Sequence, residues 1–256
     1  MQITIIGSGN IATHFARFFY DHGLHITQVY SRTMAHAHVL AEMVSAQAVD
    51  KLSELDTEVD LILLAVSDDS IADVAAQLPH STRAIVVHTS GATPLDVLSA
   101  FGRYGVIYPP QSINNHVMVD LSKIPFAIEG SSTEVEGILL EMMGKMAPGA
   151  FSCTSKQRLA LHLASVFANN FSNALYQIAF DILQRENLDF NLIKPLILET
   201  AQKVQTHIPK QVQTGPAIRN DFKTINTHLQ FLSNTPEWAE IYQQLTDFIR
   251  KSSSKI

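Results

Sequence analysis

The 256-residue sequence contains only one cysteine, Cys153, and this scarcity excludes two kinds of site. A lone thiol can neither form a disulfide within the chain nor build a cysteine-based metal cluster. The 11 histidines are scattered and show no HExxH-type spacing. We therefore expect no metal site, and the missing disulfide favours a reducing, cytoplasmic location.

The sequence also lacks long apolar runs and an excess of positive charge. No apolar run reaches the length of a membrane span, and the N-terminus already reads as a strand rather than a secretory signal. The 24 acidic residues outnumber the 18 lysines and arginines and give a formal net charge of −6. Without a basic surface, nucleic acid is an unsuitable partner. We expect no nucleic-acid and no membrane partner.

The most informative motif follows the first strand directly. It is Gly7-Ser8-Gly9-Asn10-Ile11-Ala12, a G-x-G-x-x-A fingerprint placed where a strand turns into a helix. Gly7 permits the tight turn, Gly9 lets a pyrophosphate approach the backbone, and Ala12 allows the helix to pack closely on the strand. The helix N-terminus then offers free N–H groups to phosphate. The motif predicts a dinucleotide site; the alternative is a plain strand–turn–helix.

The end of the second predicted strand, residues 25–30, indicates which dinucleotide binds. NAD-preferring sites place an acidic residue here, but this chain has Ser31-Arg32-Thr33. A guanidinium can bind a 2′-phosphate with two parallel hydrogen bonds, so we expect NADP. The alternative is a solvated Arg32 in a turn, with Ser31 or Thr33 capping the next helix. The predicted cofactor-binding residues are Gly7, Ser8, Gly9, Asn10, Ile11, Ser31, Arg32, Thr33, Val66 and Ser67.

Apolar strand-like runs alternate with helical patterns through the first half of the chain. The run at residues 59–66 is almost wholly apolar, as in a strand covered by helices on both faces. This alternation predicts an α/β fold, a Rossmann-type doubly wound parallel sheet with ligands at the carboxyl ends of its strands. We assign residues 1–154 to an NADP-binding domain and residues 155–256 to a helical domain for substrate binding and dimerisation.

Polar residues follow three of the predicted strands. Val66 and Ser67 are expected to contact the cofactor through their backbone, and Asp69 is expected to cap the next helix. His88 ends an apolar strand near the expected nicotinamide position, where it either donates a proton or is an ordinary core residue. The segment Tyr108-Pro109-Pro110-Gln111-Ser112 either lines the substrate pocket or only leads the chain out of the sheet. A second helix start is expected at Thr93-Pro94.

The second half is helical. One long helix is expected over residues 155–185, which contain no Gly or Pro. His162, Asn169, Asn170 and Asn173 lie close to its apolar face, and buried amides cost free energy unless they are hydrogen-bonded. They therefore indicate a polar pocket or polar contacts with another helix. Further helices are expected over 191–206, 221–232 and 236–249.

A polar cluster at residues 214–228 adds two candidates. Asp221 or Asn220 can cap a helix on which Thr224 and His228 share a face. Arg219 could pair with Asp221 or bind a substrate carboxylate. The alternative for the whole cluster is a loop that anchors the last helices. The candidate catalytic residues are His162, Asn170, His88, Arg219 and His228.

Several of these motifs resemble known families. Residues 7–12, 31–32 and 65–69 resemble the NADP-binding domain of pyrroline-5-carboxylate reductases and deazaflavin-dependent NADP reductases. Residues 162–171 and 214–229 resemble the helical domain of unknown function in a family of bacterial Rossmann-like oxidoreductases. The resemblance implies a C-terminal domain like that of 6-phosphogluconate dehydrogenase relatives and homodimers built through its helices. An apolar stripe from Trp238 to Ile249 agrees with such a dimer or is ordinary core.

The chain departs from one branch of these relatives. β-Hydroxyacid dehydrogenases use a Lys four residues before an Asn on the long helix, and if Asn170 matches that Asn, the Lys position holds Val166. Either His162, His88 or His228 then supplies the proton, or the reaction differs, or there is no reaction. The leading hypothesis is an NADPH-dependent reductase of a small carbonyl or imine compound. The alternatives are hydride exchange with a deazaflavin, and a non-catalytic NADP-binding sensor.

Overall fold

The computed structural model describes residues 1–114 and 119–253. The chain divides into two compact units, Met1–Phe171 and Ser172–Ile256. The predicted domain boundary at 154/155 stays a prediction, because compact units need not coincide with domains. We describe each unit by itself.

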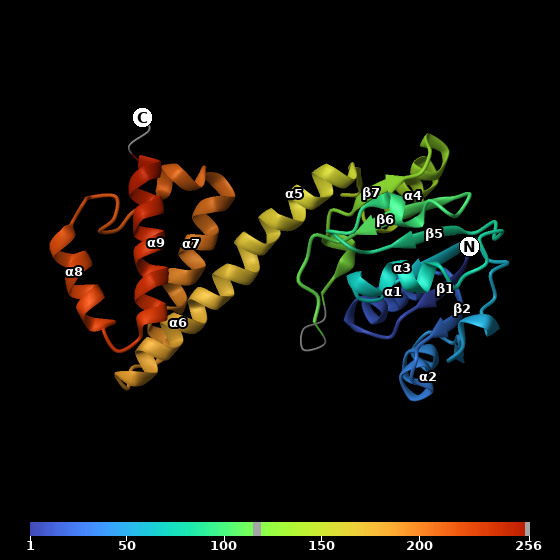
Figure 1. Cartoon of the computed structure of the whole chain (residues 1–256), viewed down its shortest axis with the longest axis horizontal. Helices are drawn as coiled ribbons and strands as arrows, with labels where there is room; N and C mark the ends of the chain where they lie inside the picture. The colour runs from blue at the N-terminus through green and yellow to red at the C-terminus, as the bar shows by residue number, and fades with distance from the viewer. Residues whose placement is uncertain (115–118, 254–256) are drawn as a thin grey trace. The chain divides into compact units, whose positions relative to one another are not determined.

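The first unit is built on one eight-stranded sheet (Figure 1). The strand order is β3-β2-β1-β4-β5-β6-β7-β8. The chain therefore adds β2 and β3 on one side of β1, then crosses to its other side for β4, as in a doubly wound fold. The strands are β1 (Gln2–Ile6), β2 (His25–Tyr30), β3 (Gln47–Val49), β4 (Leu61–Leu64), β5 (Ile85–His88), β6 (Tyr104–Tyr108), β7 (Ala127–Gly130) and β8 (Phe151–Ser152).

One strand pair departs from the predicted parallel sheet. Strand β7 runs antiparallel to β6, with Val106 opposite Glu129 and Tyr108 opposite Ala127. The other strand pairs are parallel. Single-sequence patterns predict strands but not their direction, which depends on where the intervening segment leads the chain. The antiparallel pair places Glu129 opposite Val106, the middle residue of β6.

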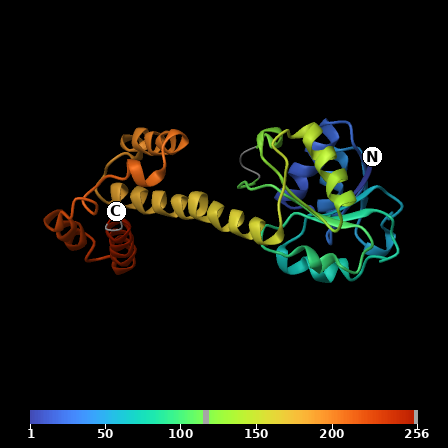
Figure 2. The same cartoon turned by 90° about the horizontal axis from the view of Figure 1, so that it is seen from above.

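Helices cover both faces of the sheet (Figure 2). Alternate residues of β4 serve the two faces: Leu61 and Leu63 pack with α1 and α4, whereas Ile62 and Leu64 pack with α3. A third, smaller core contains Val106, Tyr108, Ala127 and Cys153. The helices of this unit are α1 (Asn10–Asp21), α2 (Met34–Met43), α3 (Ile71–Ala75), α4 (Thr133–Met146) and α5 (Ser155–Ser165).

Two predicted helix starts were wrong. Asp69 is not an N-cap: it lies inside a 3₁₀ turn at Asp68–Ser70, and Ser70 occupies the N-cap position of α3. Thr93-Pro94 does not begin an α-helix, because Pro94 is extended and only a 3₁₀ turn at Leu95–Leu98 follows. In both places the backbone departs from what local capping chemistry alone predicts, a common failure of local rules.

The predicted long helix exists but contains an irregular segment. Helical residues run from Ser155 to Arg185, and the stretch Val166–Phe171 is π-helical. Thr154 and Gln157 form a capping box at the start. Within α5 and the π-helical segment, the large apolar side chains of Leu163 and Phe167 are exposed. Such π-helical turns are rare and occur frequently at functional sites.

The second unit contains α6 (Ser172–Arg185), α7 (Lys194–Thr206), α8 (Phe222–Phe231) and α9 (Pro236–Ser253). Asp221 caps α8 by accepting the N–H of Thr224 at 3.1 Å. The stripe on α9 is not core in this chain: Ile241 and Leu245 are exposed, and Phe248 is 68% exposed. In the residues described, no helix is long and apolar enough to cross a bilayer.

Candidate functional site

The predicted dinucleotide motif opens onto a cavity of about 510 Å³ at the carboxyl ends of β1, β2 and β4. Seven of the predicted cofactor-binding residues line it: Gly7, Ser8, Gly9, Ser31, Arg32, Val66 and Ser67. The lining also includes Tyr30, Leu52, Ala65, Ser70, Asp73, Val74 and Gln77. The structure therefore brings together three sequence segments that the motif treats separately.

The two fingerprint glycines differ in what surrounds them. Gly7 has a positive φ of 126°, and a Cβ there would lie 2.2 Å from the carbonyl oxygen of Ala65. Gly9 is different, because a Cβ there would meet no atom within 4 Å. Gly7 is thus required by the fold of the unit itself. Gly9 leaves open space at the start of α1, where a pyrophosphate needs a close approach to the backbone.

The start of α1 suits an anion. The 12-residue helix has no acidic residue in its first turn, and within the described residues no side chain caps it. Its first N–H groups and the positive end of its dipole therefore remain available to a phosphate. Together with the space at Gly9, these features fit a bound dinucleotide.

The end of β2 presents Ser31 and Arg32 to the same cavity. Ser31 is buried and accepts a hydrogen bond from the Ser8 hydroxyl at 2.8 Å, while Arg32 is exposed. Three predicted residues do not line the cavity. Asn10 donates to the Ile113 carbonyl at 3.5 Å, Ile11 lies in the first turn of α1, and Thr33 stands at the N-cap of α2.

A second cavity, of about 320 Å³, contains two of the candidate catalytic residues, His162 and Asn170. It is lined by the end of β6 and the following turn, by α5 and by the π-helical segment. The lining residues are Tyr108, Pro110, Gln111, Ser112, His162, Ser165, Val166, Ala168, Asn169 and Asn170. The turn after β6, for which two roles were open, thus lines a pocket.

Tyr108 and His162 form the polar contact in this cavity with the most defined geometry. The Tyr108 Oη lies 3.1 Å from the His162 Nδ1, and the two rings meet edge to face with centroids 5.9 Å apart. Burial raises the pKa of the Tyr108 phenol, so the phenol is protonated at neutral pH. The His162 ring also packs against Gly91, directly beyond the end of β5.

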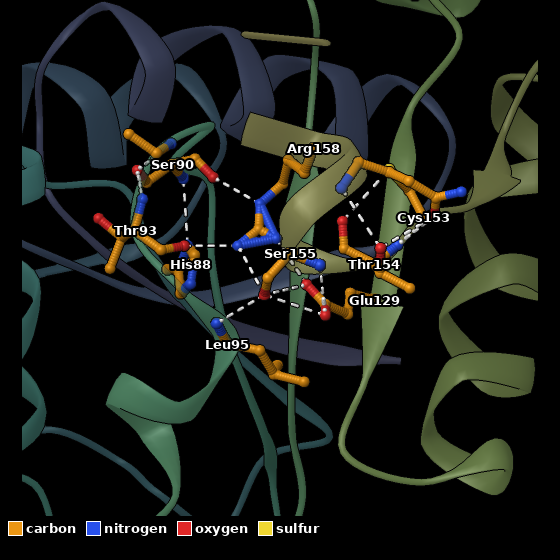
Figure 3. A network of polar contacts seen from close by, with 11 residues as sticks. His88, Ser90, Thr93, Leu95, Glu129, Cys153, Thr154, Ser155 and Arg158 are labelled. Atoms are coloured by element: carbon orange, nitrogen blue, oxygen red, sulfur yellow. Dashed lines mark hydrogen bonds and ion pairs between the residues drawn. The ribbon is translucent and has the colours of Figure 1, made fainter. Parts of the chain in front are cut away.

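One turn before His162, a buried arginine ties α5 to the sheet (Figure 3). Arg158 is 1% exposed, and its Nη1 lies 2.6 Å from the Glu129 Oε2. Its guanidinium also donates to the carbonyl oxygens of Ser90 and Thr93. The network thereby fixes the loop after β5 and the first turns of α5 against each other.

The Glu129 carboxylate also accepts hydrogen bonds from Ser155, at the start of α5. The carboxylate accepts the backbone N–H of Ser155 at 2.7 Å and the Ser155 hydroxyl at 2.8 Å. The Ser155 hydroxyl in turn accepts the N–H of Leu95 at 3.1 Å. Burial lowers the pKa of Arg158, while Glu129 counteracts this shift. Removal of either partner of such a buried ion pair would leave an uncompensated buried charge and lower the stability of the fold.

His88 does not have the surroundings of a proton donor. It is fully buried at the end of β5, and its Nδ1 accepts the N–H of Ser90 at 3.2 Å. Burial, with a smaller contribution from Arg158, lowers its pKa to about 4, so the ring is neutral at pH 7. It lines neither cavity. Its burial and its absence from both cavities disfavour the predicted catalytic role and agree with the alternative of a core histidine.

Arg219 and His228 belong to the second unit. Both are exposed, and the His228 Nδ1 lies 2.9 Å from the Tyr242 hydroxyl. Hydrogen bonds from Thr224 lower the pKa of Asp221, with a smaller contribution from the charge of Arg219. The capping role of Asp221 is confirmed, and the roles of Arg219 and His228 stay predictions.

Sequence reasoning missed Tyr108 as a reactive group, and it missed Arg158 and Glu129 entirely. A signal for Arg158 was present, because it stands four residues before His162 and therefore on the same helical face. A charged side chain on a face expected to be covered indicates a buried partner. The sequence gives no comparable signal for Glu129, whose role depends on the antiparallel strand.

Comparison with known proteins gives matches to both halves. The family described as NADP oxidoreductase, coenzyme F420-dependent, matches residues 2–91, and the Domain of unknown function DUF2520 matches residues 124–249. A crystal structure reported as a putative NADP oxidoreductase from Bacteroides fragilis is 37% identical, with a TM-score of 0.88 over 98% of each chain. These matches confirm the predicted resemblance.

Two more distant similarities extend the comparison. The 1-pyrroline-5-carboxylate reductase of Streptococcus pyogenes shares the fold, with a TM-score of 0.66 and 13% identity over 98% of each chain. The L-aspartate dehydrogenase of Methanothermobacter thermautotrophicus is 30% identical over 94 residues. That alignment covers 36% of this chain and spans 37% of the dehydrogenase, little more than a third of its length.

Proposed function

Since the chain belongs to the family of NADP oxidoreductases that carry a DUF2520 domain, we propose that it is a reductase that transfers hydride from NADPH to a small carbonyl or imine substrate. The single observation that carries this proposal is the pairing of two cavities in the first unit. One is lined by the dinucleotide motif, and the other holds a tyrosine–histidine pair.

Gly7, Ser8, Gly9, Val66 and Ser67 would hold the phosphates and the adjoining ribose in the first cavity, with Asn10 and Ile11 contributing N–H groups of α1. Ser31, Arg32 and Thr33 would hold the 2′-phosphate that distinguishes NADP from NAD. When bound, the dihydronicotinamide supplies the hydride. The side chains around it determine orientation and proton supply.

In the second cavity, His162 would be the source of the proton and Asn170 would orient the substrate through its amide. Val166, at the position where β-hydroxyacid dehydrogenases carry Lys, also lines this cavity and cannot transfer a proton. A histidine is therefore the group best suited to the role. We propose substrate binding for Arg219 and proton supply for His228 as alternatives from the second unit.

We also propose a cytoplasmic homodimer built through the C-terminal helices. Exposed apolar side chains on the second unit support the dimer, because soluble monomers seldom expose so many large apolar groups. The largest of them on α9 are Ile241, Leu245 and Phe248. The single cysteine supports a reducing compartment.

The first test is a fluorescence titration with NADPH and NADH on the unaltered protein, Arg32→Ala and Arg83→Ala. Arg83 is an exposed arginine next to the opposite end of β5 and serves as the matched control. We expect Arg32→Ala to weaken NADPH binding about 10- to 100-fold, the value of one charge-assisted pair, and to leave NADH unchanged. Equal losses for both nucleotides would contradict the NADP assignment, and no binding of either would contradict the reductase proposal.

A second candidate is hydride exchange between NADP and a deazaflavin. The family description of residues 2–91 favours it. Reduction of a deazaflavin by NADPH, without turnover of carbonyl or imine compounds, would support this candidate over the first. Tight NADPH binding with no turnover of any of these acceptors would favour a non-catalytic sensor.

A further inference from the structure

The hydroxyl of Tyr108 and the imidazole of His162 lie within hydrogen-bond distance of each other in the second cavity. Tyr108 is 7% exposed at the end of β6, and its Oη lies 3.1 Å from the His162 Nδ1. A hydroxyl has one proton to donate and can accept two hydrogen bonds. If the Nδ1–H donates to the Tyr108 oxygen, the phenolic proton is left for a ligand in the cavity.

The His162 ring has little freedom to leave this arrangement. A Cβ built on Gly91 would lie 2.8 Å from both the Cγ and the Nδ1 of that ring, so the ring occupies the space beside the Gly91 backbone. Arg158, one turn earlier on α5, is anchored to the Ser90 carbonyl at 3.1 Å. His162 therefore contacts both the loop after β5 and Tyr108. Catalytic groups benefit from such pre-organisation.

The remaining polar side chains of the cavity are neutral hydroxyls and amides, which belong to Gln111, Ser112, Ser165, Asn169 and Asn170. The Ser165 hydroxyl already donates to the Leu161 carbonyl at 2.9 Å, and the other four groups have protons to donate to a ligand. Among the described residues that line the cavity there is no Asp, Glu, Lys or Arg. Hydroxyl and amide donors stabilise negative charge that develops on an oxygen. A positively charged iminium would instead favour a carboxylate, which this lining does not supply.

We propose that the substrate is a ketone or aldehyde and that Tyr108 is the catalytic residue that donates the proton to its oxygen, with His162 as the positioning residue that restores the proton. This inference rests on the proposed NADPH-dependent reduction. The carbonyl carbon gains a C–H bond from the hydride of the dihydronicotinamide while its π bond to oxygen breaks. The Tyr108 O–H bond breaks as the new alcohol O–H bond forms. The Tyr108 oxygen then takes the Nδ1 proton of His162 while the Nε2 of that ring takes a proton from solvent, so the ring carries the same charge before and after the step.

The charged and polar surroundings of Tyr108 agree with this role. Burial raises the pKa of the phenol and so does the charge of Asp68, whereas Ser165 and Arg158 act in the opposite direction. A phenol with a raised pKa is a weak acid. It can protonate a developing alkoxide, which is a strong base, more readily than an imine nitrogen, which must be protonated before hydride arrives.

The test compares Tyr108→Phe, His162→Gln and the control Tyr104→Phe. Tyr104 begins the same strand, four residues before Tyr108, and does not line the cavity. NADPH affinity is measured by fluorescence, and NADPH oxidation is measured over matched sets of ketones, aldehydes and preformed imines. We expect Tyr108→Phe to lower kcat on carbonyl compounds about 100-fold or more, with the NADPH Kd within about twofold of the unaltered protein. Tyr104→Phe should have no effect.

A measurement without substrate tests the pair itself. In protein labelled with ¹³C at the tyrosine Cζ, the Tyr108 resonance is identified by its loss in Tyr108→Phe. We expect His162→Gln to shift this resonance and to change the pH profile of turnover; the changed pH profile is the effect that loss of packing alone would not produce. An unmoved resonance would overturn the proposed pair.

Turnover measurements distinguish a failure of the proposed Tyr108 role from a failure of the proposed reductase function. Tyr108→Phe with carbonyl turnover within about threefold of the unaltered protein would overturn the role of Tyr108, while leaving the reductase proposal intact. A clear preference for imines would overturn the substrate class alone. No turnover of any compound by the unaltered protein would contradict the proposed function, and this inference with it.

Discussion

Gly91 has no room for a side chain, because the ring of His162 occupies the space that its Cβ would take. A Cβ at this position would lie 2.8 Å from the His162 Cγ. The contact joins the loop after β5 to the helix that lines the second cavity. It makes the position of a candidate catalytic ring dependent on a backbone position 71 residues earlier in the chain.

We expect Gly91→Ala to displace the His162 ring and to lower turnover about 10-fold or more, since small misplacements of reacting groups are costly. Overpacking should also lower the free energy of unfolding by about 1–3 kcal/mol. Gly102→Ala is the control, because a Cβ there meets no atom within 4 Å. NADPH oxidation and chemical unfolding check both effects, and equal turnover of the two variants would contradict the first.

Arg158→Met should lower the free energy of unfolding by about 3–5 kcal/mol, because it leaves the largely buried Glu129 carboxylate without its partner. The double variant Arg158→Met/Glu129→Gln removes both charges and should recover part of that loss. Chemical unfolding followed by circular dichroism measures the three proteins. A double variant less stable than Arg158→Met would show that the charge of Glu129 is not the cause.

The two fingerprint glycines should respond differently to alanine. Gly7→Ala should destabilise the first unit, since its Cβ would collide with the Ala65 carbonyl and its φ is positive. Gly9→Ala should leave the melting temperature unchanged and weaken NADPH binding, because only a bound pyrophosphate needs that space. Thermal unfolding and nucleotide titration test the pair. Normal NADPH affinity in folded Gly9→Ala would place the phosphates elsewhere.

Stability should fall on acidification through His88. Its pKa is about 4 in the folded chain and about 6.5 in the unfolded chain, so between these values the unfolded state binds more protons. The free energy of unfolding should therefore fall by on the order of 3 kcal/mol from pH 7 to pH 4 through this group. In His88→Gln this part of the pH dependence should be missing. Parallel pH profiles of the two proteins would contradict the assignment.

Phe248→Glu should convert the proposed dimer into a monomer. Phe248 is 68% exposed on α9, so a charge there costs little in a single chain but is unfavourable inside an apolar interface. Light scattering coupled to size-exclusion chromatography measures the mass. Glu237→Gln, near the start of the same helix, is the control. A monomeric unaltered protein would contradict the dimer.

The sequence predicted the elements of the first unit well, because hydrophobic periodicity acts locally. Strand β2 has the predicted bounds, and most of the predicted cofactor-binding residues share a cavity. The G-x-G-x-x-A motif was informative since its three small residues have separate physical reasons to be small. Tertiary structure was not needed to see them.

Other features could not be read from the sequence. The direction of β7 and the contact between Tyr108 and His162 depend on residues far apart in the chain, whose pairing no local pattern records. The π-helical segment contains no Gly or Pro that would indicate an irregular helix. His88 ends an apolar strand, as a candidate near the nicotinamide should, but only the structure shows that its ring is fully buried.

The Arg158–Glu129 ion pair also constrains how this protein can change over evolutionary time. Losing either residue alone leaves a buried charge, so a neutral route to an apolar pair must pass through a less stable intermediate. Arg158 also donates to the Ser90 and Thr93 carbonyls, which no substitution at those positions removes, because they are backbone atoms. The side chain at position 93 can therefore change while the loop remains attached to the arginine. Position 90 is more constrained, because the buried Ser90 hydroxyl accepts the N–H groups of Ala92 and Thr93 and so holds the loop itself.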